Sequence, residues 1–161
     1  MRLRFLYVLF IGLLLATFIG VGIAAFHEGP KMPEAPISIK YQEPNCAQLK
    51  DCQALQELKT EQKNFDDLMK IYESDSKTYN RDVSIISIIS ALLMLIISLT
   101  LFKKILLIAD GVLLGSVFTL IYGIIRGFNS GNNIFRFIVV SIGLAVSLFL
   151  GYIKFIKTSK K

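Results

Sequence analysis

The residues of this chain that could carry chemistry are few and widely spaced. Asp110 is the one carboxylate inside an apolar stretch, His27 is the sole histidine, and Cys46 and Cys52 are the only cysteines. A catalytic nucleophile needs a neighbouring base, and a phosphate-binding loop needs clustered glycines before a lysine; the sequence contains neither pattern. We therefore expect no catalytic residues, no enzyme activity, no cofactor and no metal site.

Asp110 is the strongest candidate, because ionisable residues inside membrane segments commonly have functional roles. It lies six residues after Lys104, about 9 Å along a helix, and Lys103 lies one residue further back on a similar face. One interpretation is a structural ion pair or an interfacial residue near the cytoplasmic boundary. The other is an intramembrane site for a proton or a cation. Arg126, about 24 Å further along the same helix, is too distant to be its partner there.

A pair of cysteines in an oxidising compartment predicts a disulfide. Along one continuous helix, however, the Cα atoms of Cys46 and Cys52 would be about 9 Å apart, beyond the roughly 7 Å limit for bridging. An internal bond therefore requires the helix to begin after Cys46. Free thiols and an intermolecular bond are the alternatives.

The elements that carry these residues are predicted to be membrane spans. Hydrophobic residues make up 53% of the 161-residue chain, and its mean hydropathy of +0.58 is too high for an ordinary soluble domain of this size. Four stretches of about 20 mostly apolar residues are each long enough to cross a hydrocarbon core of about 30 Å. We predict an all-α integral membrane protein with transmembrane helices over residues 5–26, 83–102, 105–125 and 134–153.

The basic residues predict the orientation of these spans. Eight of the ten that lie outside residues 27–82 fall on one side of the membrane, so the positive-inside rule places both termini in the cytoplasm and residues 27–82 outside it. The net charge of +6 is then mainly a topology signal, and we expect no nucleic-acid binding. The eight residues are Arg2, Arg4, Lys103, Lys104, Lys154, Lys157, Lys160 and Lys161.

Residues 1–26 have an alternative interpretation as a signal peptide that is cleaved after Ala24. The apolar run of about 22 residues exceeds the roughly 7–15 residues of a signal-peptide core. This length favours an uncleaved anchor.

Small residues recur at four-residue spacing along the spans, and in the third span they are expected on one face. Helix association in lipid depends on close van der Waals contact, which small side chains allow, so we interpret the pattern as helix packing. A permeation path is the alternative, although none of the four spans contains a proline. The helix-packing candidates are Gly12, Ala16, Gly20 and Ala24, then Gly111, Gly115, Gly123 and Gly127, and finally Gly143, Ser147 and Gly151, with a similar stripe of Ser84, Ser87, Ala91 and Ser98 in the second span.

The segment between the first two spans predicts an extended linker followed by a long amphipathic helix. All four prolines lie in residues 27–44, and residues 45–82 place apolar side chains at alternating spacings of three and four, as in a coiled coil. The linker is long enough to follow a helical stalk and cover part of its apolar seam with Ile37, Ile39 and Tyr41. The alternative is a helix that breaks near residues 74–80 and lies on the bilayer or a partner. The seam is Leu55, Leu58, Phe65, Met69, Tyr72 and Tyr79.

The predicted organisation is thus an anchor (1–26), a linker (27–44), an outer helix (45–82) and a three-helix membrane unit with a basic cytoplasmic tail (83–161). An elaborate outer segment on plain spans favours a structural or interaction protein of a prokaryotic cytoplasmic membrane, which presents its outer helix to a protein partner or to copies of itself. The alternative is a small channel or transporter subunit that uses Asp110 and the glycine-rich helix faces.

Overall fold

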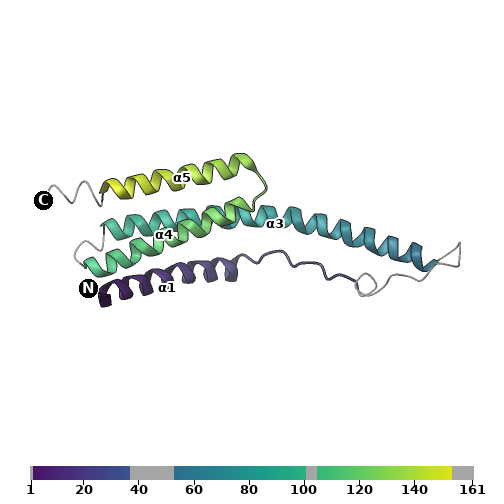
Figure 1. The fold of residues 1–161 in the computed structure, drawn as a ribbon, viewed down its shortest axis with the longest axis horizontal. Coiled ribbons are helices and arrows are strands. Elements are labelled where there is room, and N and C mark those ends of the chain that lie inside the picture. Colours follow the sequence, from purple (N-terminus) through teal and green to yellow (C-terminus); the bar gives the residue numbers. More distant parts are fainter. Residues whose placement is uncertain (1, 37–52, 101–104, 154–161) are drawn as a thin grey trace. The chain divides into compact units, whose positions relative to one another are not determined.

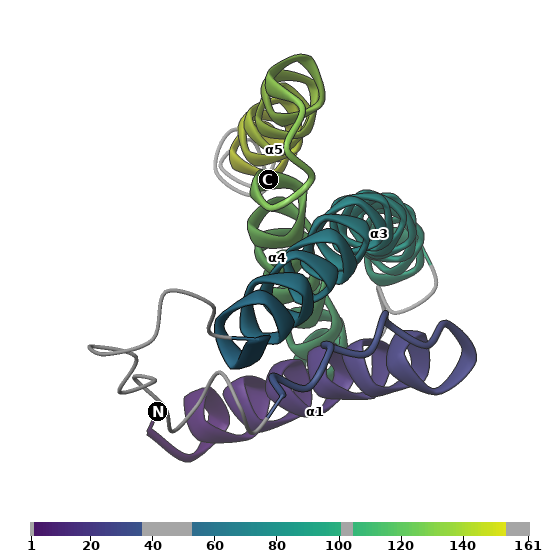
Figure 2. The same ribbon diagram turned by 90° about the vertical axis from the view of Figure 1, so that its right-hand side faces the viewer.

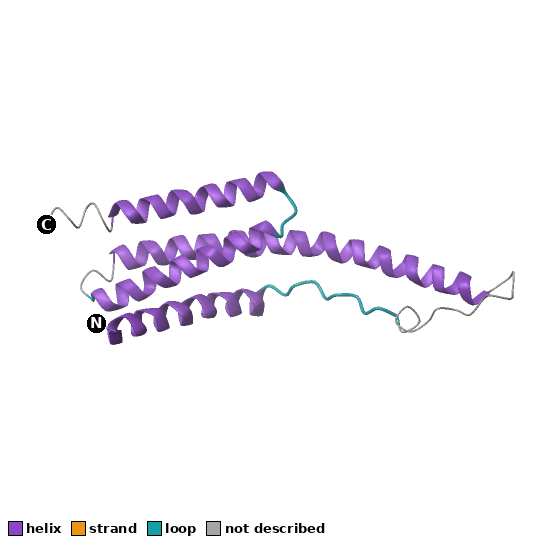
Figure 3. Cartoon of the chain, in the orientation of Figure 1, coloured by secondary structure: helices purple, strands orange, loops and turns teal. Residues whose placement is uncertain are grey.

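The structure is a computed structural model that describes residues 2–36, 53–100 and 105–153. Within these ranges the chain is all-α (Figure 3). The four helices there are long and apolar enough to cross a membrane, which confirms this part of the predicted fold class. Cys46, Cys52 and the linker residues Ile37, Ile39 and Tyr41 lie outside the described residues. The helices are α1 (Arg2–Phe26), α3 (Gln53–Thr100), α4 (Leu106–Phe128) and α5 (Asn133–Gly151).

The polar helix and the second span form one continuous helix. α3 runs from Gln53 to Thr100 without interruption, so the alternative with a break near residues 74–80 is not observed. Residues 74–80 are rich in serine, aspartate, threonine and asparagine, which are mediocre helix formers. They contain no glycine or proline, so the expected cost in helix propensity is below about 0.7 kcal/mol per residue. Packing of Tyr79 and Asn80, described below, readily offsets such a cost.

The chain divides into two compact units, which we describe separately. The bundle unit comprises Met1–Glu28 and Lys77–Lys161, and the polar unit comprises Gly29–Ser76. Helix α3 contributes its first half to the polar unit and its second half to the bundle unit.

In the polar unit, burial along the linker repeats every third residue. Residues 29–36 form neither helix nor strand, and their half-buried positions alternate with pairs of exposed ones. A period of three is that of a polyproline II helix, which presents every third side chain on one face. The half-buried linker residues are Pro30, Pro33 and Pro36. The seam of α3 is half-buried at Phe65, Met69 and Tyr72. The proline face of the linker and the seam of α3 are thus less exposed than the positions that flank them in this unit.

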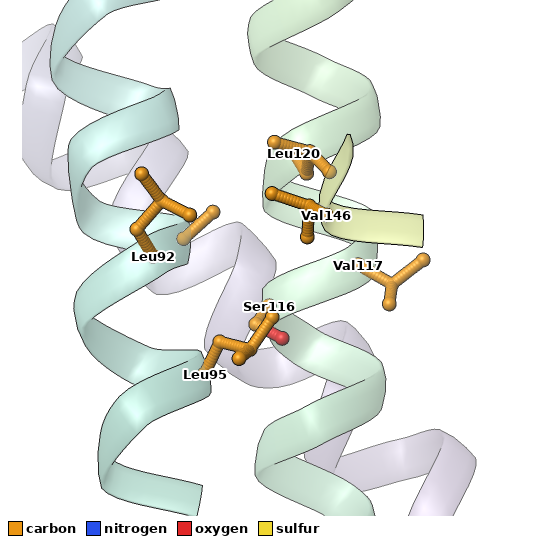
Figure 4. A pocket seen from close by; sticks show the side chains of 7 residues that line it. Leu92, Leu95, Ser116, Val117, Leu120 and Val146 are labelled. Atoms are coloured by element: carbon orange, nitrogen blue, oxygen red, sulfur yellow. The ribbon is translucent and has the colours of Figure 1, made fainter. Parts of the chain in front are cut away.

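In the bundle unit, α4 is the central helix. It lies between α1 and α5, with the second half of α3 against another of its sides (Figure 1, Figure 2). The apolar core between α3, α4 and α5 consists of Ile88, Ala91, Leu120 and Val139. The void beside this core is about 10 Å³, which is room for about one water molecule (Figure 4).

The glycines of α4 lie against two neighbouring helices, α1 and α3, although the sequence pattern predicted that they would share one face of the helix. Four residues turn an α-helix by about 400°, so a four-residue grid rotates by about 40° at each step. A Cβ at Gly111 would lie 2.9 Å from Ile11 of α1, and one at Gly115 would lie 3.2 Å from the backbone oxygen of Gly12. A Cβ at Gly123 would instead meet Ser84, Ser87 and Ile88 of α3 at 3.1–3.3 Å. The grid therefore winds from the α1 contact to the α3 contact.

The remaining small residues divide into packed and open positions. Gly12 lies against Gly115, Gly127 against Ser84 and Val139, and Gly143 against Ile124. Ala16 is half-buried. A Cβ at Gly20 or Gly151 would meet no described atom within 4 Å, and Ala24 and Ser147 are exposed. These last four residues lie on faces that the described part of the chain leaves open.

The small-residue stripe of α3 is buried against α4. Ser84 and Ser87 have 0% exposure, and Ala91 and Ser98 are almost as inaccessible. The Ser84 hydroxyl donates to the backbone oxygen of Gly123 at 2.7 Å, and the Ser98 hydroxyl donates to that of Ala109, also at 2.7 Å. These interhelical bonds connect α3 and α4 at two separate levels of the bundle.

Candidate functional site

Charged side chains lie near both ends of the bundle unit. At one end is the Arg126 cluster, which we define as His27, Tyr79, Asn80, Tyr122 and Arg126. At the opposite end, α1 and α4 form the Asp110 groove, which contains Arg4 and Asp110. We examine both because the sequence alone pointed only to Asp110.

The Arg126 guanidinium is held by side chains from two helices. Its Nη1 donates to Asn80 Oδ1 of α3 at 2.8 Å, and its Nε donates to the Tyr122 hydroxyl, one turn earlier on α4, at 3.1 Å. Its central carbon lies 5.6 Å from the centroid of the Tyr79 ring and 5.5 Å from that of Tyr122. Both distances allow cation–π attraction, so hydrogen bonds and ring faces together position this one cation.

His27 extends the cluster to a third helix. It directly follows α1, and its ring stacks on Tyr79 with centroids 5.2 Å apart and planes 18° from parallel. A lone histidine after an apolar span is expected to be exposed at the interface, whereas His27 is half-buried. Tyr79, assigned to the seam on sequence grounds, contacts His27 and Arg126 within the bundle unit.

The Arg126 cluster has a positive charge that no described carboxylate neutralises. Arg126 makes no ion pair with a carboxylate among the described residues, and its Asn80 partner is 8% exposed. Partial burial of an unpaired charge is unfavourable unless polar groups compensate, which Asn80 and the tyrosines do in part. A guanidinium has five N–H groups, and the two hydrogen bonds use two of them. The remaining N–H groups are available to an acceptor.

The turn between α4 and α5 adds further donors at this end. Gly131 has φ +74, which favours glycine, and it lies against the side chain of Lys77, one turn before Asn80. Asn132 then caps α5 by accepting hydrogen bonds from the backbone of Ile134 and Phe135. The hydroxyl of Ser130 and the Nε of Arg136 are buried and have no hydrogen-bond partner among the described residues.

The Asp110 groove lies at the other end of the bundle. It is open, has a volume of about 450 Å³, and places the acidic Asp110 of α4 and the basic Arg4 of α1 in one lining. Sequence reasoning considered Lys103 and Lys104 as partners of Asp110, but both lie outside the described residues. Arg4 was counted only as a topology signal, because the proximity of α1 to α4 is a tertiary property. The rest of the lining is Phe5, Val8, Leu106, Leu107, Leu113 and Leu114.

The Arg126 cluster was not recognised as a unit from the sequence. The one local signal was the spacing of Tyr122 and Arg126, which lie four residues apart and therefore on one helix face. Their pairing with Tyr79 and Asn80 depends on the register between α3 and α4.

Within the described ranges, no group of three or more histidine, cysteine, aspartate or glutamate side chains is arranged to hold a metal ion. Comparisons with protein-family models, curated proteins and solved structures give no match for this chain.

Proposed function

We propose that this chain is a multi-pass membrane protein whose outer helix binds a protein partner or a second copy of the chain. The observation that carries the proposal is the continuity of α3, which joins a polar half to a half buried in the bundle. A partner bound to the polar half would therefore be joined to the bundle half through one uninterrupted helix.

The surface that we assign to the partner is on the exposed flank of α3. Leu68 is 53% exposed and Ile71 is 59% exposed, three residues apart on one helix face. They lie beside the seam, whose described side chains in the polar unit are half-buried. A pair of large apolar side chains on an otherwise charged helix is a reasonable anchor for an interface, because interface energy concentrates in a few such residues.

The proposed orientation places both termini in the cytoplasm and the polar unit outside the membrane. The distribution of basic residues supports this orientation. The first residue of α1 and the last residue of α5 also lie at the same end of the bundle unit (Figure 1), as an even number of spans requires.

Site-specific photocrosslinking tests the interaction. A photoreactive residue at position 68 or 71 should give a discrete crosslinked product in intact membranes, whereas one at the exposed position 63 should not. Mass spectrometry of the product distinguishes a second copy from another protein. Equal crosslinking at all three positions, or none at positions 68 and 71, would contradict the proposal.

The second candidate is a small channel or transporter subunit, favoured by the opposite charges in the Asp110 groove. The void of about 10 Å³ between α3, α4 and α5 has room for about one water molecule. Ion flux into liposomes that is present for the wild-type protein and lost in Asp110→Asn would establish the transport role instead.

A further inference from the structure

We infer that the Arg126 cluster binds the phosphate group of a phospholipid. This site is independent of the protein–protein contact proposed above. It uses residues of the bundle unit, whereas Leu68 and Ile71 belong to the polar unit.

The recognised chemistry is that of an oxyanion. Arg126 retains N–H groups that make no hydrogen bond to the described residues, and no described carboxylate pairs with it. A guanidinium presents these donors as a planar fork that matches phosphate oxygens. The contacts with Asn80, Tyr79 and Tyr122 hold that fork in place before a ligand arrives, which lowers the entropy cost of binding.

A second, independent observation comes from the adjoining turn. The Ser130 residue is 9% exposed, and its hydroxyl is buried without a partner, as is the Nε of Arg136. The backbone N–H of Ser130 bonds to the oxygen of Gly127, so this turn folds back on the last turn of α4, next to Arg126. A guanidinium Nε–H can only donate, and buried unpaired donors are uncommon in native proteins. These donors are a second feature of this end of the bundle for which the described residues supply no acceptor.

The lipid is favoured over a free anion because of what surrounds the cluster. The same turns of α4 carry large exposed apolar side chains that could contact acyl chains. Arginine and tyrosine together are also typical of the headgroup level of a bilayer. The exposed side chains are Ile121 at 47%, Ile125 at 57% and Phe128 at 50%.

The test measures binding of fluorescent phosphatidylglycerol to the full-length protein in detergent, with diacylglycerol, which carries acyl chains but no phosphate, at the same mole fraction as the reference lipid. Arg126→Gln should weaken phosphatidylglycerol binding roughly tenfold, the usual effect of losing a hydrogen-bonded charge. Arg81→Gln is the matched control. It removes the same charge one residue from Asn80, from an exposed arginine that pairs with Asp82 at 3.2 Å.

A conservative variant and a competition experiment further test the inference. Arg126→Lys keeps the charge but loses the fork, so it should bind more weakly than wild type, and it replaces Arg126→Gln if that variant does not fold. Inorganic phosphate should compete with the lipid at high concentration. Equal losses in Arg126→Gln and Arg81→Gln, or no preference for phosphatidylglycerol, would overturn the inference. Binding of inorganic phosphate that depends on Arg126, without retention of lipid, would overturn the assignment to a phospholipid.

Discussion

The bundle half of α3 buries small polar side chains, which the described positions of the polar half do not. In the half that belongs to the bundle unit, Ser84 and Ser87 are fully buried beside Val83 and Ile88, while Ile85 and Ile89 are exposed. In the half that belongs to the polar unit, the half-buried positions are large, as Phe65 shows, and the charged positions are exposed.

The difference follows from the solvent that each half is built for. In water, removal of apolar surface stabilises contacts, so large side chains turn inward. In lipid, an isoleucine gains little by leaving the acyl chains, and close backbone approach through small residues stabilises the contact instead. The two halves of α3 therefore pack by different means. We expect a large side chain at a close backbone approach to destabilise the bundle half, and replacement of an exposed apolar residue in the polar half to leave stability unchanged.

The largest expected effect is a large side chain at a close approach in the bundle. Gly123→Leu and Gly115→Leu should each lower the free energy of unfolding by about 1–3 kcal/mol, because the added atoms meet backbone that cannot move aside. Thermal unfolding in detergent measures the loss. Gly20→Leu is the matched control, because a Cβ there would meet no described atom within 4 Å. Equal destabilisation at Gly20 would contradict the packing assignment, because leucine is the better helix former and no described atom lies close to a Cβ at that position.

A smaller loss of stability is expected when Ser84, whose hydroxyl bonds across to α4, is replaced by alanine. Ser84→Ala removes a hydrogen bond from α3 to the Gly123 carbonyl and should cost about 0.6 kcal/mol, the average for such bonds in membranes. Ser87→Ala, whose hydroxyl bonds to Val83 within α3, is the control and should cost less. The same unfolding assay compares them, and a larger loss for Ser87→Ala would refute the assignment.

Asp110→Asn should affect stability less than either leucine variant. The residue is half-buried in an open groove, and an amide retains hydrogen-bonding capacity while losing the charge opposite Arg4. If Asp110→Asn unfolded the protein while both leucine variants were tolerated, Asp110, and not the two glycines, would be the residue that stabilises the bundle.

In the polar half, exchange of an exposed apolar residue should leave folding unchanged. Leu68→Asn with Ile71→Asn should shift the free energy of unfolding by less than about 0.5 kcal/mol, as surface changes generally do. Ile71→Asn should weaken the crosslink from a photoreactive residue at position 68, and Leu68→Asn should weaken the crosslink from one at position 71. Loss of folding would instead mean that the flank packs within the chain.

The smallest effect concerns the exposed Lys70–Asp67 pair, whose atoms are 3.0 Å apart. Its hydrogen bond and charge attraction to Asp67 raise the pKa of Lys70 above the usual 10.5. A raised pKa stabilises the folded state below the unfolded pKa, and this contribution is lost only as the pH rises through the folded pKa. Because the pair is exposed and screened by solvent, this contribution is too small to measure, so Lys70→Gln and wild type should melt together at every pH. A clear difference in melting temperature between Lys70→Gln and wild type at neutral pH would show that the pair stabilises the folded state.

The sequence by itself determined which helices are long and apolar enough to cross a membrane, and the composition of their packing faces. Apolar stretches of about twenty residues match the thickness of a hydrocarbon core, and small residues at regular spacing mark where backbones approach, as at Gly12 and Gly115. These are local properties, so they can be read from the order of residues. The amphipathic helix of the polar unit was also recognisable, because its apolar period is local.

Tertiary structure alone decided which neighbour each face meets. The glycine grid of α4 divides between α1 and α3 because it winds around the helix while its neighbours lie on different sides. Arg126 meets Asn80, 46 positions earlier in the chain, because the register of α3 against α4 is set by Ser84, Gly123 and the surrounding contacts. Such pairings depend on the relative position of two helices, which the period within either helix does not contain.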